Sequence, residues 1–187
     1  MANVNKIEQY NKGTVFPDSY EETYLATKHI SDIKLAIPND IFKKLKQKIE
    51  EKGLYFGDDS VLRNIIAGII KGNIILQGPP GTGKTTLAKI ICDVFEVAYT
   101  EATANSDWTT YDSIGGLQPS ANDEGHEVIE GKNGYVVSSI LKCCDLIVKN
   151  ENDNGTLQGN WLILDELNRC EIDKVFGDLF TALGSDA

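Results

Sequence analysis

Three segments of the chain repeat apolar residues at the spacing of a single helix face. The first is predicted to begin after Pro38-Asn39-Asp40 and to end at Gly53, since short polar residues favour helix starts and glycine favours helix ends. The second is predicted to run from Asp58-Asp59-Ser60 to Gly72, and the third covers residues 84–95. Their apolar stripes are, in order, Ile41, Phe42, Leu45 and Ile49; Leu62, Ile65, Ile66, Ile69 and Ile70; and Leu87, Ile90, Ile91 and Val94.

Short apolar runs rich in β-branched residues predict strands around the third helix. Asn73–Gln77 comes directly before it, Val97–Thr103 follows it, and Trp161–Leu164 lies further along the chain. Further helices are predicted from Ser138 to Lys149 and from Glu171 to Leu183.

The segment between the second and third predicted strands is harder to interpret. His126–Glu130 and Tyr135–Val137 flank the glycine-rich turn Gly131–Gly134, which predicts a β-hairpin. A plain surface loop is the alternative. Residues 1–36 are polar without firm periodicity and are interpreted as an N-terminal extension.

A glycine-rich loop separates the strand 73–77 from the helix that follows. It fits the phosphate-binding pattern G-x-x-x-x-G-K-[ST] at every fixed position, and glycine lets the backbone approach a triphosphate closely. The helix N-terminus adds partial positive charge for the anion. We expect Lys84 to reach the β- and γ-phosphates as a catalytic residue and the Thr85 hydroxyl to hold Mg²⁺. The expected nucleotide-binding residues are Gly78, Pro79, Pro80, Gly81, Thr82, Gly83, Lys84, Thr85 and Thr86.

A second motif, Asp165-Glu166, ends the apolar run that begins at Trp161. A carboxylate at the end of a strand beside the loop can bind the same Mg²⁺ as Thr85, so Asp165 is the second expected metal ligand. Glu166 is then placed to orient or deprotonate a water that attacks the γ-phosphate, and is the expected catalytic carboxylate.

Together, GPPGTGKTT and WLILDELNRCEIDKVFGDLF resemble the core of an AAA+ ATPase. Within that superfamily the chain resembles the McrB-type and MoxR/dynein-related branch, whose acidic motif continues as D-E-[IL]-N-R and is here Asp165–Arg169. The segment Ser106–Gly116 also resembles this branch, and the similarity covers about residues 55–187. The predicted hairpin sits where that branch carries its helix-2 insertion.

This resemblance implies an α/β P-loop NTPase fold, a parallel sheet sandwiched by helices, with residues 37–187 forming the N-terminal part of an AAA+ domain. It also implies ATP or GTP as substrate, Mg²⁺ as cofactor, and a ring, typically a hexamer, that remodels a protein or nucleic-acid client. Family members continue with a sensor strand, an arginine finger and a helical lid, so we expect a fragment of a longer protein, the alternative being a degenerate short version. By its family position Arg169 either approaches a subunit interface or forms a salt bridge on its own helix turn.

Two other functions share the phosphate loop. A nucleotide-binding module could switch or scaffold without turnover. A small-molecule kinase is disfavoured by Asp165-Glu166, since a kinase excludes hydrolytic water instead of activating it.

Charge and composition limit which binding partners and which cellular compartment we expect for this protein. Residues 1–53 carry nine Lys/Arg against eight Asp/Glu, whereas residues 54–187 carry nine against twenty, so the motif-bearing part is strongly acidic. This disfavours non-specific binding of duplex nucleic acid. No apolar run suits a membrane span or a signal peptide, which predicts a cytoplasmic protein. The cysteines, with no C-x-x-C pair, are interpreted as buried and reduced.

Overall fold

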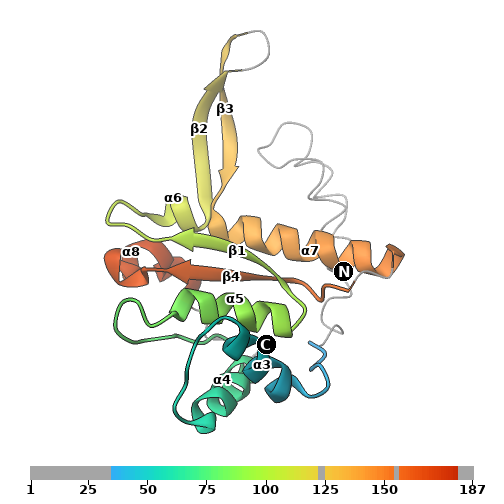
Figure 1. Cartoon of the computed structure of the whole chain (residues 1–187). Coiled ribbons are helices and arrows are strands. Elements are labelled where there is room, and N and C mark those ends of the chain that lie inside the picture. The colour runs from blue at the N-terminus through green and yellow to red at the C-terminus, as the bar shows by residue number, and fades with distance from the viewer. Residues whose placement is uncertain (1–34, 122–124, 154–155, 181–187) are drawn as a thin grey trace.

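The computed structural model describes residues 35–121, 125–153 and 156–180. At its centre lie two parallel strands, β1 (Ala98–Thr103) and β4 (Asn160–Asp165), paired in register from Ala98 opposite Asn160 to Thr103 opposite Asp165. Helix α5 (Lys84–Val94) covers one face of this sheet, and α7 (Tyr135–Asp153) covers the other (Figure 1). The expected α/β architecture, a parallel sheet between helix layers, is confirmed.

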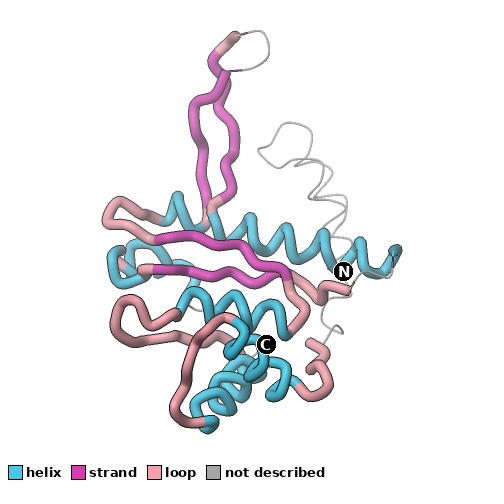
Figure 2. Tube along the Cα trace, viewed as in Figure 1, coloured by secondary structure: helices cyan, strands magenta, loops and turns pink. Residues whose placement is uncertain are grey.

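Two further helices lie on the outer side of α5 (Figure 2). These are α3 (Ile41–Glu51) and α4 (Asp59–Lys71), and both agree with the sequence-based prediction within a few residues. The Asp58 side chain accepts the Ser60 N–H at 2.9 Å, which satisfies one of the unpaired donors of the first turn of α4. The apolar stripes of the three helices meet in one core, with Leu45 and Phe95 each only 1% exposed.

The expected strand at Asn73–Gln77 does not form among the described residues. This segment is extended but pairs with neither β1 nor β4, and a strand exists only where a neighbour completes its hydrogen-bond ladder. Its side chains still alternate, because Ile74 and Leu76 pack against the core while Ile75 is 88% exposed. The prediction of a buried strand here is therefore wrong, although Ile74 and Leu76 are partly buried against the core.

A β-hairpin is present, but the predicted register is wrong. Its strands are β2 (Gly115–Ala121) and β3 (Glu127–Asn133), while Tyr135 begins α7 and does not form a strand. The Tyr135 ring stacks on Trp108 with centroids 5.2 Å apart, and this contact lies at the base of the hairpin. The hairpin projects from the body of the molecule (Figure 1), and β3 is exposed along almost its whole length, so this strand lacks the alternating burial that a sequence pattern would show.

Short elements close the carboxyl end of the sheet. They are α6 (Thr110–Ser113), the 3₁₀ turn η2 (Leu167–Arg169), α8 (Ile172–Phe176) and the 3₁₀ turn η3 (Gly177–Leu179). The predicted helix Glu171–Leu183 is thus divided in two, and its last residues lie outside the described ranges. Val175 is fully buried here beside Phe176 and Trp108 in a second apolar core.

The four cysteines are free thiols, and three of them, Cys92, Cys144 and Cys170, are buried as expected. Burial raises the pKa of Cys92 to about 11, so this thiol stays protonated and acts as a small apolar residue. Among the residues that the structure describes, every helix is too short or too polar to cross a lipid bilayer.

Candidate nucleotide-binding site

The glycine-rich loop turns through two left-handed residues before α5. Gly81 has φ 77° and Gly83 has φ 78°, a region that residues with a Cβ rarely occupy. A Cβ at Gly83 would also lie 2.5 Å from Leu54 Cδ2, which covers the loop from the α3–α4 connection. Gly78 is different, because its φ is not positive and a Cβ there would make only an ordinary 3.6 Å contact with Thr82 Oγ1.

Lys84 lies at the start of α5, and its ammonium group folds back over the loop. Its Nζ donates to the carbonyl oxygens of Gly78 at 3.0 Å and Pro79 at 2.8 Å. The Thr82 hydroxyl donates to the same Pro79 carbonyl at 2.9 Å. The lysine charge and the N-terminus of an 11-residue helix therefore face one short turn, the arrangement that favours an anion.

Thr85 and Asp165, which are 80 residues apart in the sequence, are joined by a hydrogen bond. The Thr85 hydroxyl donates to Asp165 Oδ2 at 2.7 Å. Helix α5 supplies the threonine and the carboxyl end of β4 supplies the aspartate, so the packing of α5 on the sheet creates the contact. The two residues predicted to share one Mg²⁺ are therefore adjacent, and both have the oxygen atoms that this ion prefers.

The pKa of Asp165 is held below its usual value. The Thr85 hydrogen bond is the largest cause; partial desolvation opposes it, and the Glu166 N–H and the charges of Lys84 and Lys89 add to it. Asp165 is therefore anionic at neutral pH, as a metal ligand must be.

Glu166 follows directly and has an unusual backbone for a residue with a side chain. Its φ is 52°, its N–H donates to Asp165 Oδ1 at 2.9 Å, and its carboxylate accepts a bond from Arg169 Nε at 3.2 Å. Of the two alternatives left open for Arg169, a salt bridge on its own turn is present.

Lys89 belongs to this region and was missed by the sequence analysis. Its Nζ lies 2.7 Å from Glu101 Oε2 on β1. This ion pair holds the Lys89 ammonium group one helix turn beyond Thr85. Its spacing of four residues from Thr85 on a predicted helix was the available signal.

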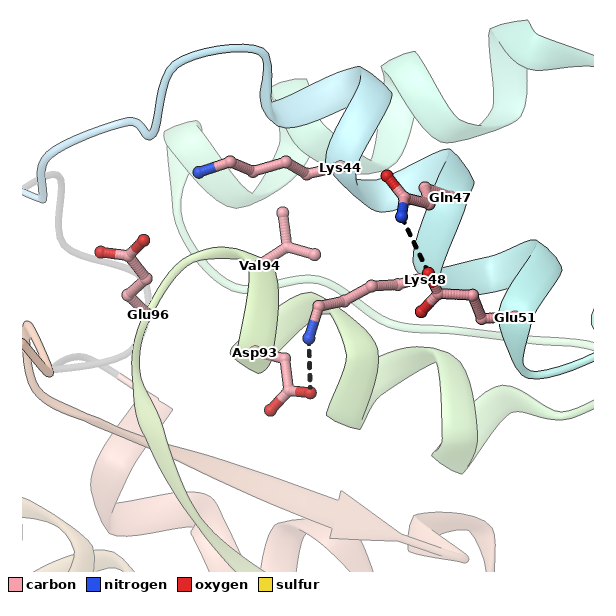
Figure 3. Close-up of a pocket in the computed structure, with 7 residues that line it drawn as sticks. All are labelled: Lys44, Gln47, Lys48, Glu51, Asp93, Val94 and Glu96. Atoms are coloured by element: carbon pink, nitrogen blue, oxygen red, sulfur yellow. Dashed lines mark hydrogen bonds and ion pairs between the residues drawn. The ribbon is translucent and has the colours of Figure 1, made fainter.

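A separate hollow lies at the other end of α5, against α3 (Figure 3). Its lining residues are Lys44, Gln47, Lys48, Glu51, Asp93, Val94 and Glu96. The Lys48 ammonium is paired with Asp93 at 3.1 Å, and the remaining charges have mixed sign. The hollow contains no residue of the phosphate loop or the acidic motif and is not part of the nucleotide site.

The geometry of the loop and of the acidic motif agrees with a comparison against protein families. Residues 73–186 match the model of the AAA domain, dynein-related subfamily. The chain belongs to this family. AAA domains generally bind and hydrolyse nucleotides, and they commonly assemble as rings.

Individual proteins match the chain only over part of its length and at low sequence identity. The chain is 35% identical over 124 residues to the mitochondrial Lon protease homologues of Candida dubliniensis and Candida albicans, which covers 64% of this chain and 10% of each relative. An uncharacterized protein of Staphylococcus epidermidis is 28% identical over 96 residues, covering 51% of this chain and 30% of the relative. The AAA chain therefore spans less than a third of the length of each of these relatives.

Alanine at position 83 is expected to lower the free energy of unfolding by about 1–3 kcal/mol, the usual cost of a non-glycine residue in a strained backbone region. Gly83→Ala should also be destabilising in a Leu54→Ala background, because removing the steric contact leaves the φ cost. Gly78→Ala is the matched control and should be nearly neutral. Urea unfolding of the parent, the three single variants and the double variant measures the effect; equal loss at Gly78 and Gly83 would contradict it.

Replacing Thr85 by valine should raise the pKa of Asp165, since the main cause of its depression is removed. A lowered folded-state pKa stabilises the fold above the unfolded value of about 3.9, and that stability is lost as pH falls through the folded pKa. Thr85→Val should therefore lose less stability on acidification than the parent. Carbon-13 NMR titration of the Asp165 carboxyl checks this, with Thr86→Val as control because that side chain is exposed. An unchanged Asp165 titration in Thr85→Val would count against the hydrogen bond.

Proposed function

We propose that this chain is the nucleotide-binding core of an AAA+ motor, of the McrB-type and MoxR-like branch, that binds ATP or GTP with Mg²⁺ and hydrolyses it. The observation that supports this most directly is the 2.7 Å hydrogen bond between Thr85 and Asp165. It joins the phosphate loop to the acidic motif, and Glu166 is the next residue along the chain.

The residues of the phosphate-binding loop have different roles in nucleotide binding. The α5 N-terminus and the backbone N–H groups of Gly78 and residues 81–86 bind the phosphates, whereas Pro79 and Pro80 have no N–H and restrict the loop backbone. Lys84 exchanges its two carbonyl acceptors for phosphate oxygens, which are better partners because they are charged. The Lys84 ammonium group therefore lies at the loop before the nucleotide binds.

Hydrolysis depends on the acidic motif. Thr85 and Asp165 would hold Mg²⁺, which when bound neutralises negative charge on the phosphates. Glu166 orients a water and accepts its proton as the water attacks the γ-phosphate. Lys84 stabilises the charge that develops on the phosphate oxygens.

The assembly proposed for the intact protein is a hexameric ring acting on a protein or nucleic-acid client. AAA domains commonly form rings, and the acidic charge of residues 54–187 favours clients other than bare duplex.

Nucleotide affinity should depend on Lys84. Charge-assisted hydrogen bonds contribute about 1.5–3 kcal/mol each, so Lys84→Ala should weaken binding by about tenfold or more. Calorimetric titration with ATP and, separately, GTP in the presence of Mg²⁺ measures this and also identifies the base. Lys71→Ala removes an exposed lysine from the end of α4 and should bind as the parent does. Parental affinity in Lys84→Ala would overturn the assignment of the loop.

Binding and turnover should separate at the acidic motif. In the intact protein, Glu166→Gln should keep nucleotide affinity and lower phosphate release by about 10²-fold or more, because the general base is removed. Asp165→Asn should instead weaken the Mg²⁺ dependence of binding. Glu171→Gln, an exposed carboxylate five residues away, is the control. If no variant or parent protein releases phosphate while all bind nucleotide, the chain is a binding module without turnover.

A further inference from the structure

The backbone of Glu166 requires support from its surroundings. A φ of 52° places it in the left-handed region, where a residue with a long side chain is disfavoured. Such a conformation persists only where neighbouring groups fix it. Glu166 is held by hydrogen bonds to Asp165 on one side and to Arg169 on the other.

Arg169 contacts Glu166 twice. Its backbone N–H donates to the Glu166 carbonyl oxygen at 2.9 Å, which closes the 3₁₀ turn η2. Its side-chain Nε donates to Glu166 Oε2 at 3.2 Å. One residue thus fixes both the main chain and the carboxylate of the proposed water-orienting residue, while Asp165 Oδ1 anchors the Glu166 N–H.

This ion pair contributes little to stability. The Arg169 and Glu166 side chains are 60% and 43% exposed, and solvent screens the attraction of ion pairs with such exposure. Its consequence is geometric, because a planar guanidinium that donates through Nε constrains the carboxylate in direction as well as in distance. The chain has one other arginine, Arg63, whose guanidinium lies 4.2 Å from the centre of the Phe42 ring on the far side of α5.

We propose that Arg169 is a positioning residue for hydrolysis, which holds the Glu166 carboxylate in the direction needed to orient the attacking water. The proposal rests on the proposed function. Without Arg169 the carboxylate samples other rotamers, and a displacement of about 1 Å in a catalytic group costs about 10²-fold in rate. The nucleotide is bound by other residues, so its affinity does not depend on Arg169.

The test is a double-mutant cycle in the intact protein with Arg169→Ala, Glu166→Gln and the double variant. We expect Arg169→Ala to lower kcat by about tenfold to a hundredfold and to leave KM and the calorimetric nucleotide affinity within about twofold. In the Glu166→Gln background, Arg169→Ala should change the residual kcat by less than about twofold, since Arg169 acts through Glu166. Arg169→Lys keeps the charge and should recover part of kcat. Lys174→Ala, an exposed cation on α8, should behave as the parent.

Three results would overturn the proposal. These are a parental kcat in Arg169→Ala, a loss of nucleotide affinity equal to the loss of kcat, or a full additional loss of rate in the Glu166→Gln background. The last result would assign Arg169 a role independent of Glu166, such as one across a subunit interface. Failure of the proposed function is distinguishable, because Glu166→Gln would then hydrolyse at the parental rate. If Arg169→Ala does not fold, Arg169→Lys and its double variant with Glu166→Gln give the same comparison.

Discussion

The hydrogen bond from Thr85 to Asp165 is the constraint on which the site depends. It requires the first turn of α5 and the last residue of β4 to meet within 2.7 Å. That proximity requires α5 to lie flat on the β1–β4 sheet, as it does (Figure 1). The same contact holds the pKa of Asp165 down, so the packing of one helix sets both the position and the charge of the carboxylate.

The position of α5 is fixed from its outer side by helices that lie before the matched family region. Residues 73–186 carry the family match, but α3 and α4 share a continuous apolar core with α5 through residues such as Leu45 and Leu62. Leu54, between those helices, also covers Gly83. The helices that precede the matched region are therefore part of the structural unit that shapes the phosphate loop, because removing them would expose one whole face of α5.

Local features of this chain could be predicted from the sequence, and features set by distant partners could not. Some features can be read from neighbouring residues alone: the apolar stripes of the helices, Gly83, Lys84, and the motifs that contain Thr85 and Asp165. The structure then brings Thr85 and Asp165 together. The strand predicted at Asn73–Gln77 failed because pairing depends on a neighbouring strand rather than on the segment itself. The predicted hairpin register failed because β3 is exposed along almost its whole length, which leaves no alternating pattern to fix its bounds. A salt bridge of Arg169 on its own turn was one of two sequence-based alternatives, but no propensity rule predicts the left-handed backbone of its partner, Glu166.

Helix α8 connects the base of the β2–β3 hairpin to the acidic motif Asp165-Glu166. Helix α8 begins three residues after Arg169, and the hydroxyls of Thr110 and Ser113 donate to the carbonyl oxygens of Lys174 and Val175 within it. Gly134, at the hairpin base, lies so close to Ser113 that a Cβ there would be 2.5 Å from its carbonyl carbon. No side chain can be accommodated without moving α6. The base of the projecting β2–β3 hairpin is thus held, through α6, by the helix that continues from the acidic motif, so the position of α8 determines the position of the hairpin base.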